Sequence, residues 1–162
     1  MDCRHIKFVN EVSEQENRSS QIDYYQLQRL FTGAFWAKDR KIEDLQIAIA
    51  NSQAVVTVWD EQRLIGFARA TSDSVYRATI WDVVIHPEYR GAGLGRKLVE
   101  TVLIHPKVNR VERVYLMTTY QQSFYERIGF EYNSSTTMVL YNQPLVTPVP
   151  VMTLQSQELS EA

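Results

Sequence analysis

The pattern of hydrophobic and polar positions predicts one strand and two helices in the first fifty residues. Polar and apolar side chains alternate over residues 4–9, which favours a short, half-exposed strand. Residues 11–20 are polar without a period and predict a loop. Apolar side chains then recur at helical spacing, first over residues 27–35 and again over residues 42–49. Asp39 is placed to cap the second of these helices.

In the middle of the chain the period changes to that of strands. Residues 53–60, 63–71 and 76–85 are rich in β-branched and aromatic side chains, and we expect three neighbouring strands there. The third run ends in nearly continuous apolar sequence, which is typical of a strand covered on both faces. The His86-Pro87 step ends this strand, because proline lacks the N–H that a ladder requires.

The remaining segments complete a mixed α/β pattern. Helical spacing returns over residues 93–104, and a short helix is expected at residues 121–128. A strand is expected at residues 111–119, and a closing hairpin at residues 130–132 and 136–142. This order of elements predicts a mixed sheet with helices on both faces.

Length and composition limit the possible classes of protein. A chain of 162 residues is about one domain, and we divide it into a folded domain over residues 1–142 and a poorly ordered tail over residues 143–162. The net charge of −2 argues against a broadly basic face for nucleic acid. Cys3 is the only cysteine, and the three histidines lack metal-ligand spacing, so we expect no disulfide and no metal. Without an apolar span or a signal pattern, we expect no membrane partner and a cytoplasmic location.

Three glycines fall within residues 91–95, between a buried strand and a predicted helix. Glycine tolerates positive φ and lets backbone N–H groups approach a ligand, and the start of the following helix favours a phosphate group. Arg90, Arg96 and Lys97 flank the loop and favour a polyanion over the alternative, a plain strand-to-helix turn. The spacing fits neither a Walker A loop nor a dinucleotide fingerprint.

Two motifs carry a family resemblance. Residues 83–95 (VVIHPEYRGAGLG) resemble the central motif of the GNAT superfamily of acyl-CoA-dependent N-acyltransferases, and residues 123–130 (SFYERIGF) resemble its second motif. Residues 63–73 and 79–84 are similar to the cyanobacterial and chloroplast branch, which includes plant serotonin N-acetyltransferases and plastid lysine acetyltransferases. The resemblance covers roughly residues 3–142 and implies a GNAT fold, a mixed sheet of about seven strands with about four helices on its two faces.

The resemblance also implies which residues bind acetyl-CoA as co-substrate. In the family, amides of the glycine loop hold the pyrophosphate, and strand amides hold the pantetheine and the acyl carbonyl. The residues carried over are Val83, Val84, Ile85, Arg90, Gly91, Ala92, Gly93, Leu94, Gly95, Arg96, Lys97 and Ser123.

Three residues are candidates for catalysis. The resemblance makes Tyr125 the proton donor to the departing thiolate, and the alternative is a core aromatic residue on an amphipathic helix. Asp82 is a carboxylate inside an apolar strand and is the candidate base, directly or through water. The alternative for Asp82 is a structural ion pair with one of three nearby arginines, Arg69, Arg77 or Arg90. Because side chains alternate along a strand, Asp82 is expected to point to the opposite face of the sheet from Trp81 and Val83, unless a bulge reorients it. His86 is a further candidate base.

The acceptor pocket is predicted from aromatic residues. Phe31, Phe35, Trp36 and Tyr76 can form a wall for an arylalkylamine or a lysine stem, and Thr79 can position a water; the alternative is that the aromatic stripe belongs to the core.

We therefore expect direct transfer of an acetyl group to a primary amine. The acceptor is either an arylalkylamine, such as serotonin or tryptamine, or a protein lysine. A homodimer is a further expectation. The alternatives are a non-catalytic acyl-CoA-binding module and a nucleotide-binding regulator.

Overall fold

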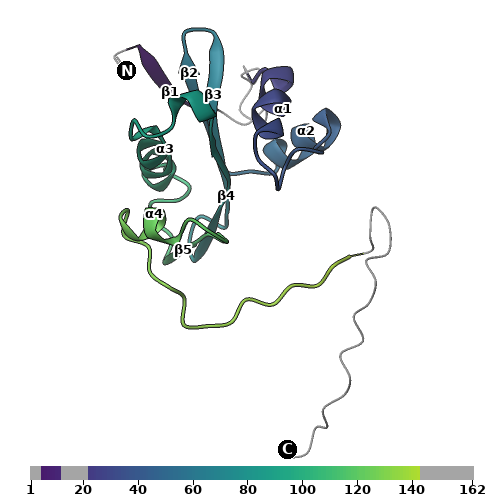
Figure 1. Cartoon of the computed structure of the whole chain (residues 1–162). Coiled ribbons are helices and arrows are strands. Elements are labelled where there is room, and N and C mark those ends of the chain that lie inside the picture. The colour runs from purple at the N-terminus through teal and green to yellow at the C-terminus, as the bar shows by residue number, and fades with distance from the viewer. Residues whose placement is uncertain (1–4, 12–21, 143–162) are drawn as a thin grey trace, which may run out of the picture. The chain divides into compact units, whose positions relative to one another are not determined.

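The computed structural model describes residues 5–11 and 22–142, and the structural statements below concern these residues. The chain combines strands and helices, as expected for a mixed α/β fold (Figure 1). In chain order they are β1 (Ile6–Asn10), α1 (Tyr24–Thr32), α2 (Ile42–Ala50), β2 (Ala54–Asp60), β3 (Arg63–Ser72), β4 (Arg77–Ile85), the 3-10 helix η2 (Pro87–Tyr89), α3 (Leu94–Leu103), β5 (Arg113–Tyr115) and α4 (Gln122–Glu126). None of the helices in this part of the chain has the length and apolar character needed to cross a membrane.

The sheet has the order β1-β2-β3-β4-β5, with antiparallel neighbours except for the parallel pair β4–β5. Helices α1 and α2 lie on one face and α3 on the other (Figure 1). Each face has its own buried cluster: Phe31, Phe67 and Val84 belong to the α1–α2 side, and Leu98 and Val102 belong to the α3 side. The prediction of helices on both faces is confirmed.

The starts of the first two helices differ in how they are capped. Asp23 Oδ1 accepts the N–H groups of Tyr25 and Gln26, both at 3.0 Å, and these bonds lower the pKa of its carboxyl. The prediction that Asp39 caps α2 is wrong, because Lys41 holds that position without a side-chain bond. Backbone turns continue through residues 33–40 and delay the helix.

A β-bulge interrupts β4 in its second half. Trp81 pairs with Arg69 and Val84 with Phe67, so Asp82 and Val83 together oppose Ala68. Asp82 takes the extra position, with a left-handed φ of 59°. The bulge shifts the alternation by one residue and turns Asp82 toward the α1–α2 face, where its ion-pair partners lie.

The end of the sheet is shorter than predicted. It has five strands rather than about seven, and β5 covers three residues of the expected 111–119. The closing hairpin at residues 130–132 and 136–142 is not present; residues 131–142 contain no helix or strand, and Met138 is 92% exposed. β-propensity is a preference for a packed, paired surface, so without ladder partners it forms no strand. The predicted tail over residues 143–162 lies outside the described residues.

Candidate active site

The loop between β4 and α3 needs glycine at two positions. Gly91 and Gly93 have φ values of 82° and 79°, in the left-handed region that L-residues with a Cβ rarely adopt. A Cβ built on either residue would meet no atom within 4 Å, so the loop backbone faces open space. The sequence folds here into a turn whose backbone a ligand can approach.

The first turn of α3 offers free donors to that space. Gly93 is the N-cap and has no side-chain cap, and the first helical bond runs from the Lys97 N–H to the Gly93 carbonyl at 3.1 Å. Within the described chain, the N–H groups of residues 94–96 have no acceptor. These donors and the dipole of a ten-residue helix favour an anion.

Three cations flank the loop, and each has a contact within the protein. Arg90 Nε donates to the Ile85 carbonyl at 3.0 Å, which ties the loop to the end of β4. Arg96 Nε pairs with Glu100 at 2.7 Å, and Lys97 Nζ lies 4.7 Å from the centre of the Phe8 ring. With respect to the residues that the structure describes, Arg90 and Arg96 bond through Nε alone, so their outer guanidinium nitrogens stay available to a phosphate.

The glycine loop and the second motif are packed together. A Cβ on Gly95 would lie 3.5 Å from the Phe124 ring and 3.8 Å from Ile85 Cγ1. The first turn of α3 therefore lies close to both α4 and the end of β4. Tyr125 is the residue after Phe124 on the same helix.

Tyr125 is half-buried on α4. Its ring makes edge-to-face contacts with Phe124 and Phe130, at centroid distances of 4.9 and 5.9 Å. Burial raises the pKa of the Tyr125 phenol, so the hydroxyl keeps its proton at neutral pH. The residue has both properties that the sequence suggested, a core contact and a retained proton. Ser123 is exposed on the same helix.

Strand β4 has an open edge next to the loop. It pairs with β5 only from Arg77 to Thr79, opposite Arg113–Tyr115. Over residues 80–85, the described chain supplies no strand on that side, so alternate N–H and C=O groups lack a ladder partner. Val83, Val84 and Ile85 lie in this stretch, beside the bulge. The half-buried Thr79 is the last paired residue, so it marks the point where the two strands separate.

Asp82 forms the ion pair that was the alternative to its role as a base. The side chain is 6% exposed, and Oδ2 accepts from Arg69 Nε at 2.6 Å and from Arg40 Nη1 at 2.8 Å. Arg69 was one of the three expected partners; Arg40 was missed, because nothing in the sequence connects the α1–α2 segment with the bulge. The other oxygen, Oδ1, has no hydrogen bond from the described residues and is not fully buried. It can accept a bond from a substrate or a water.

The predicted aromatic wall divides into buried and exposed residues. Phe31 is 1% exposed and contacts Phe67 edge-to-face, so its assignment to the acceptor pocket is corrected: it is a core residue. Phe35 and Trp36 are 73% and 44% exposed on the segment after α1. The alternative of a core stripe is right for Phe31 and wrong for these two.

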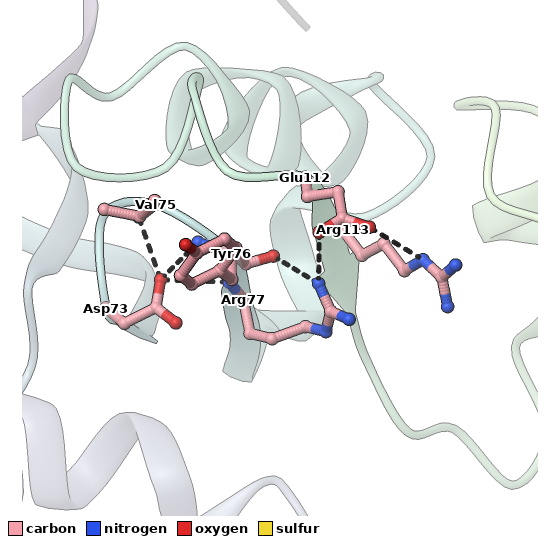
Figure 2. A network of polar contacts seen from close by, with 6 residues as sticks. All are labelled: Asp73, Val75, Tyr76, Arg77, Glu112 and Arg113. Atoms are coloured by element: carbon pink, nitrogen blue, oxygen red, sulfur yellow. Dashed lines mark hydrogen bonds and ion pairs between the residues drawn. The ribbon is translucent and has the colours of Figure 1, made fainter.

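Tyr76 is presented by a tightly bonded loop between β3 and β4 (Figure 2). Asp73 Oδ1 accepts the N–H groups of Val75, Tyr76 and Arg77 at 2.7–3.0 Å, and these bonds lower the pKa of its carboxyl. The Tyr76 carbonyl accepts from Arg77 Nη1 at 2.9 Å and from the Arg113 N–H at 3.0 Å. The Tyr76 backbone is held in place while its ring is exposed.

His86 is engaged in the structure of the loop. Its Nδ1 accepts the Glu88 N–H at 3.3 Å, and its Nε2 lies 3.1 Å from Arg63 Nη2. Burial is the main cause of a lowered pKa for this imidazole, and the positive charge of Arg63 adds to it. Both ring nitrogens contact protein groups, which leaves no free nitrogen to act as the base. In the part of the chain that the structure describes, no group of three or more His, Cys, Asp or Glu side chains is arranged to hold a metal.

Residues 21–130 match the family described as "Acetyltransferase (GNAT) family". The chain is 33% identical over 133 residues to the "Uncharacterized N-acetyltransferase ycf52" of Pyropia yezoensis, covering 79% of this chain and 74% of that protein. It is 36% identical to "GCN5-related N-acetyltransferase 2, chloroplastic" of Arabidopsis thaliana, covering 68% of this chain and 51% of the relative. It is 35% identical to "Histone acetyltransferase TAP1" of Glycine max, covering 68% and 52%.

Solved structures share the fold. A putative GNAT acetyltransferase from Xanthomonas campestris superposes with a TM-score of 0.69 and 27% identity, covering 84% of this chain and 94% of that one. The chain spans about half the length of the two plant relatives. The name of the Arabidopsis relative places that protein in the chloroplast, and so the names of the relatives do not support the expected cytoplasmic location.

Proposed function

Because the chain belongs to the GNAT acetyltransferase family and is an N-acetyltransferase, we propose that it transfers the acetyl group of acetyl-CoA directly to a primary amine. The observation that carries the proposal is the packing of Gly95 against Phe124. It joins a loop suited to a pyrophosphate with a tyrosine suited to donate a proton. The alternative of a non-catalytic acyl-CoA-binding module requires the loop but gives no role to that proton.

The site residues fit acetyl-CoA. The N–H groups at the start of α3, with Arg90, Arg96 and Lys97 around them, face the diphosphate. The unpaired edge of β4 at residues 83–85 offers backbone groups to the pantetheine arm and to the acyl carbonyl, beside the space that Gly91 and Gly93 leave open. Ala92, Leu94 and Ser123 complete the predicted contact set. The thioester supplies an acetyl group activated for attack by an amine.

The two catalytic candidates act from opposite faces of the sheet. Tyr125 packs against the cluster on the α3 side, whereas the partners of Asp82 lie on the α1–α2 side. The open edge of β4 lies between these faces. Tyr125 gives its hydroxyl proton to the sulfur as the C–S bond breaks, and regains a proton from solvent. On the other face Asp82 Oδ1 accepts an N–H of the incoming amine, and the amine proton leaves directly to the carboxylate or through a water held near Thr79.

The acceptor we propose is a protein lysine. The name of the soybean relative describes a histone acetyltransferase, and the exposed rings of Phe35, Trp36 and Tyr76 can contact the apolar stem of a lysine. An arylalkylamine such as serotonin or tryptamine is a second candidate. The partly exposed indole of Trp36 favours this candidate, because an aromatic amine can stack on it. A homodimer, testable by sedimentation, remains part of the proposal.

A mass-spectrometric screen tests the proposal. Purified protein is incubated with acetyl-CoA and a panel of lysine peptides, serotonin, tryptamine and polyamines, and each amine is inspected for a gain of one acetyl group. Transfer to any primary amine supports the enzyme. Binding of acetyl-CoA by calorimetry without transfer across the panel favours the non-catalytic module. Competition by ATP for the same site favours the nucleotide-binding regulator.

A further inference from the structure

Arg40 connects the segment that carries Trp36 with the bulge that carries Asp82. Its Nη1 donates to Asp82 Oδ2 at 2.8 Å. Its guanidinium carbon lies 5.3 Å from the ring centres of both Phe31 and Trp36. One planar cation therefore contacts an exposed aromatic residue, a core aromatic residue and a buried carboxylate.

The backbone of Arg40 is held as firmly as its side chain. Its N–H donates to the Ala37 carbonyl at 3.2 Å, and its carbonyl accepts from Gln28 Nε2 on α1 at 3.1 Å. Both the backbone and the side chain of Arg40 are therefore bonded, and the ion pair with Asp82 connects the α1–α2 segment to β4 of the sheet.

Asp82 also binds the guanidinium of Arg69 on β3, which in turn contacts the segment after α2. Arg69 Nε donates to the same Oδ2, and Arg69 Nη1 donates to Ser52 Oγ at 3.2 Å, just beyond the last residue of α2. Arg40 precedes α2 and Ser52 follows it, so both ends of the helix are connected to one carboxylate oxygen. The left-handed backbone of Asp82 costs conformational energy, which these charge-assisted bonds offset.

We propose that Arg40 is a positioning residue for the acceptor side of the reaction. It fixes the distance between the exposed Trp36 indole and Asp82 Oδ1, the groups that would contact the stem and the nitrogen of the amine. The role of the pair in turnover rests on the proposed function. The contact itself does not, and its consequences can be measured without substrate.

Three variants test the role of Arg40. Arg40→Gln removes the charge and the planar fork, Arg40→Lys keeps the charge alone, and Lys38→Gln is the matched control, because it removes an exposed positive charge from the same segment. We expect Arg40→Gln to raise the KM for the amine and lower kcat, by about tenfold in kcat/KM. We expect the KM and Kd for acetyl-CoA to stay within about twofold of the parent values, because the contacts of Arg40 described above involve no residue of the glycine loop.

A double-mutant comparison separates positioning from folding. If Arg40 acts through Asp82, adding Arg40→Gln to Asp82→Asn lowers kcat/KM for the amine no further than Asp82→Asn alone. Additive losses overturn the proposal, as does an Arg40→Gln variant that matches Lys38→Gln in amine kinetics. Arg40→Lys is expected to recover only part of the loss, since an ammonium cannot stack on two rings and reach the carboxylate in one plane.

A measurement without substrate keeps the test independent of activity. The full chain labelled with 5-fluorotryptophan gives a fluorine resonance for each indole, and the variants Trp36→Phe and Trp59→Phe assign those of Trp36 and Trp59. Arg40→Gln should move the Trp36 resonance and leave that of Trp59 in place, whereas Lys38→Gln should move neither. An unmoved Trp36 resonance overturns the proposal. If the Trp36 resonance moves in Arg40→Gln but the parent protein transfers no acetyl group, the Arg40–Trp36 contact is supported and the proposed function is contradicted.

Discussion

Gly95 on α3 faces the ring of Phe124 on α4, so closely that a Cβ on the glycine would touch the ring. A methyl group at that position would lie 3.5 Å from Phe124 Cζ, an ordinary van der Waals distance, so a larger, branched side chain has little room there. The contact connects the first turn of α3, where the free N–H donors lie, with the helix that carries Tyr125. A bulky side chain at Gly95 is therefore expected to disturb the proton donor as well as the loop.

The contact predicts different outcomes for two substitutions. Gly95→Ala should keep kcat within about twofold of the parent, because its methyl group fits without displacing the ring. Gly95→Val should displace Phe124 and with it Tyr125, and we expect kcat to fall by about tenfold or more. Steady-state kinetics with saturating acetyl-CoA measures both. Equal losses for alanine and valine would show that the spacing between the two helices does not control the reaction.

Tyr125→Phe tests the proton donor. Removal of the hydroxyl should lower kcat by about 10²–10⁴-fold while the Kd for acetyl-CoA is retained. Tyr120→Phe is the control, because Tyr120 is exposed beyond the end of β5. Burial raises the pKa of the Tyr125 phenol, so the protonated form persists through neutral pH, and the kcat of the parent should fall only in strongly alkaline solution. A kcat that Tyr125→Phe leaves unchanged would remove the residue from the mechanism.

Gly93→Ala tests the phosphate-binding loop. No atom obstructs the new methyl group, but a φ of 79° disfavours any residue with a Cβ, by about 1–2 kcal/mol. The loop should relax away from this conformation, and the Kd for acetyl-CoA should rise several-fold in calorimetry. Gly33→Ala is the control, because Gly33 has a φ of −79° and ordinary contacts. If the two variants bind acetyl-CoA equally well, the loop does not hold the diphosphate.

The sequence predicted the elements that depend on local pattern. The helices over residues 27–35 and 93–104 and the three central strands follow from periodicity, and the glycine loop follows from a turn that only glycine permits. The bulge at Asp82 could not be predicted, since it depends on register with β3, and neither could the Arg40–Asp82 pair, which joins segments far apart in the chain. The predicted hairpin fails for a different reason. Residues 136–142 have β-propensity, but the described chain provides no strand with which they pair.

Asp73 predicts a dependence of stability on pH. Three backbone N–H groups donate to its carboxylate and lower its pKa in the folded protein. The folded state therefore binds the proton less readily than the unfolded chain. The stabilisation is present above the unfolded pKa and is lost as the pH falls through the lowered, folded value. We expect Tm to fall on acidification below about pH 4, and Asp73→Asn to lower Tm at neutral pH while reducing that slope. Asp44→Asn, on an exposed face of α2, is the control. A Tm profile for Asp73→Asn as steep as that of the control would mean that the loop holding Tyr76 does not depend on this carboxylate.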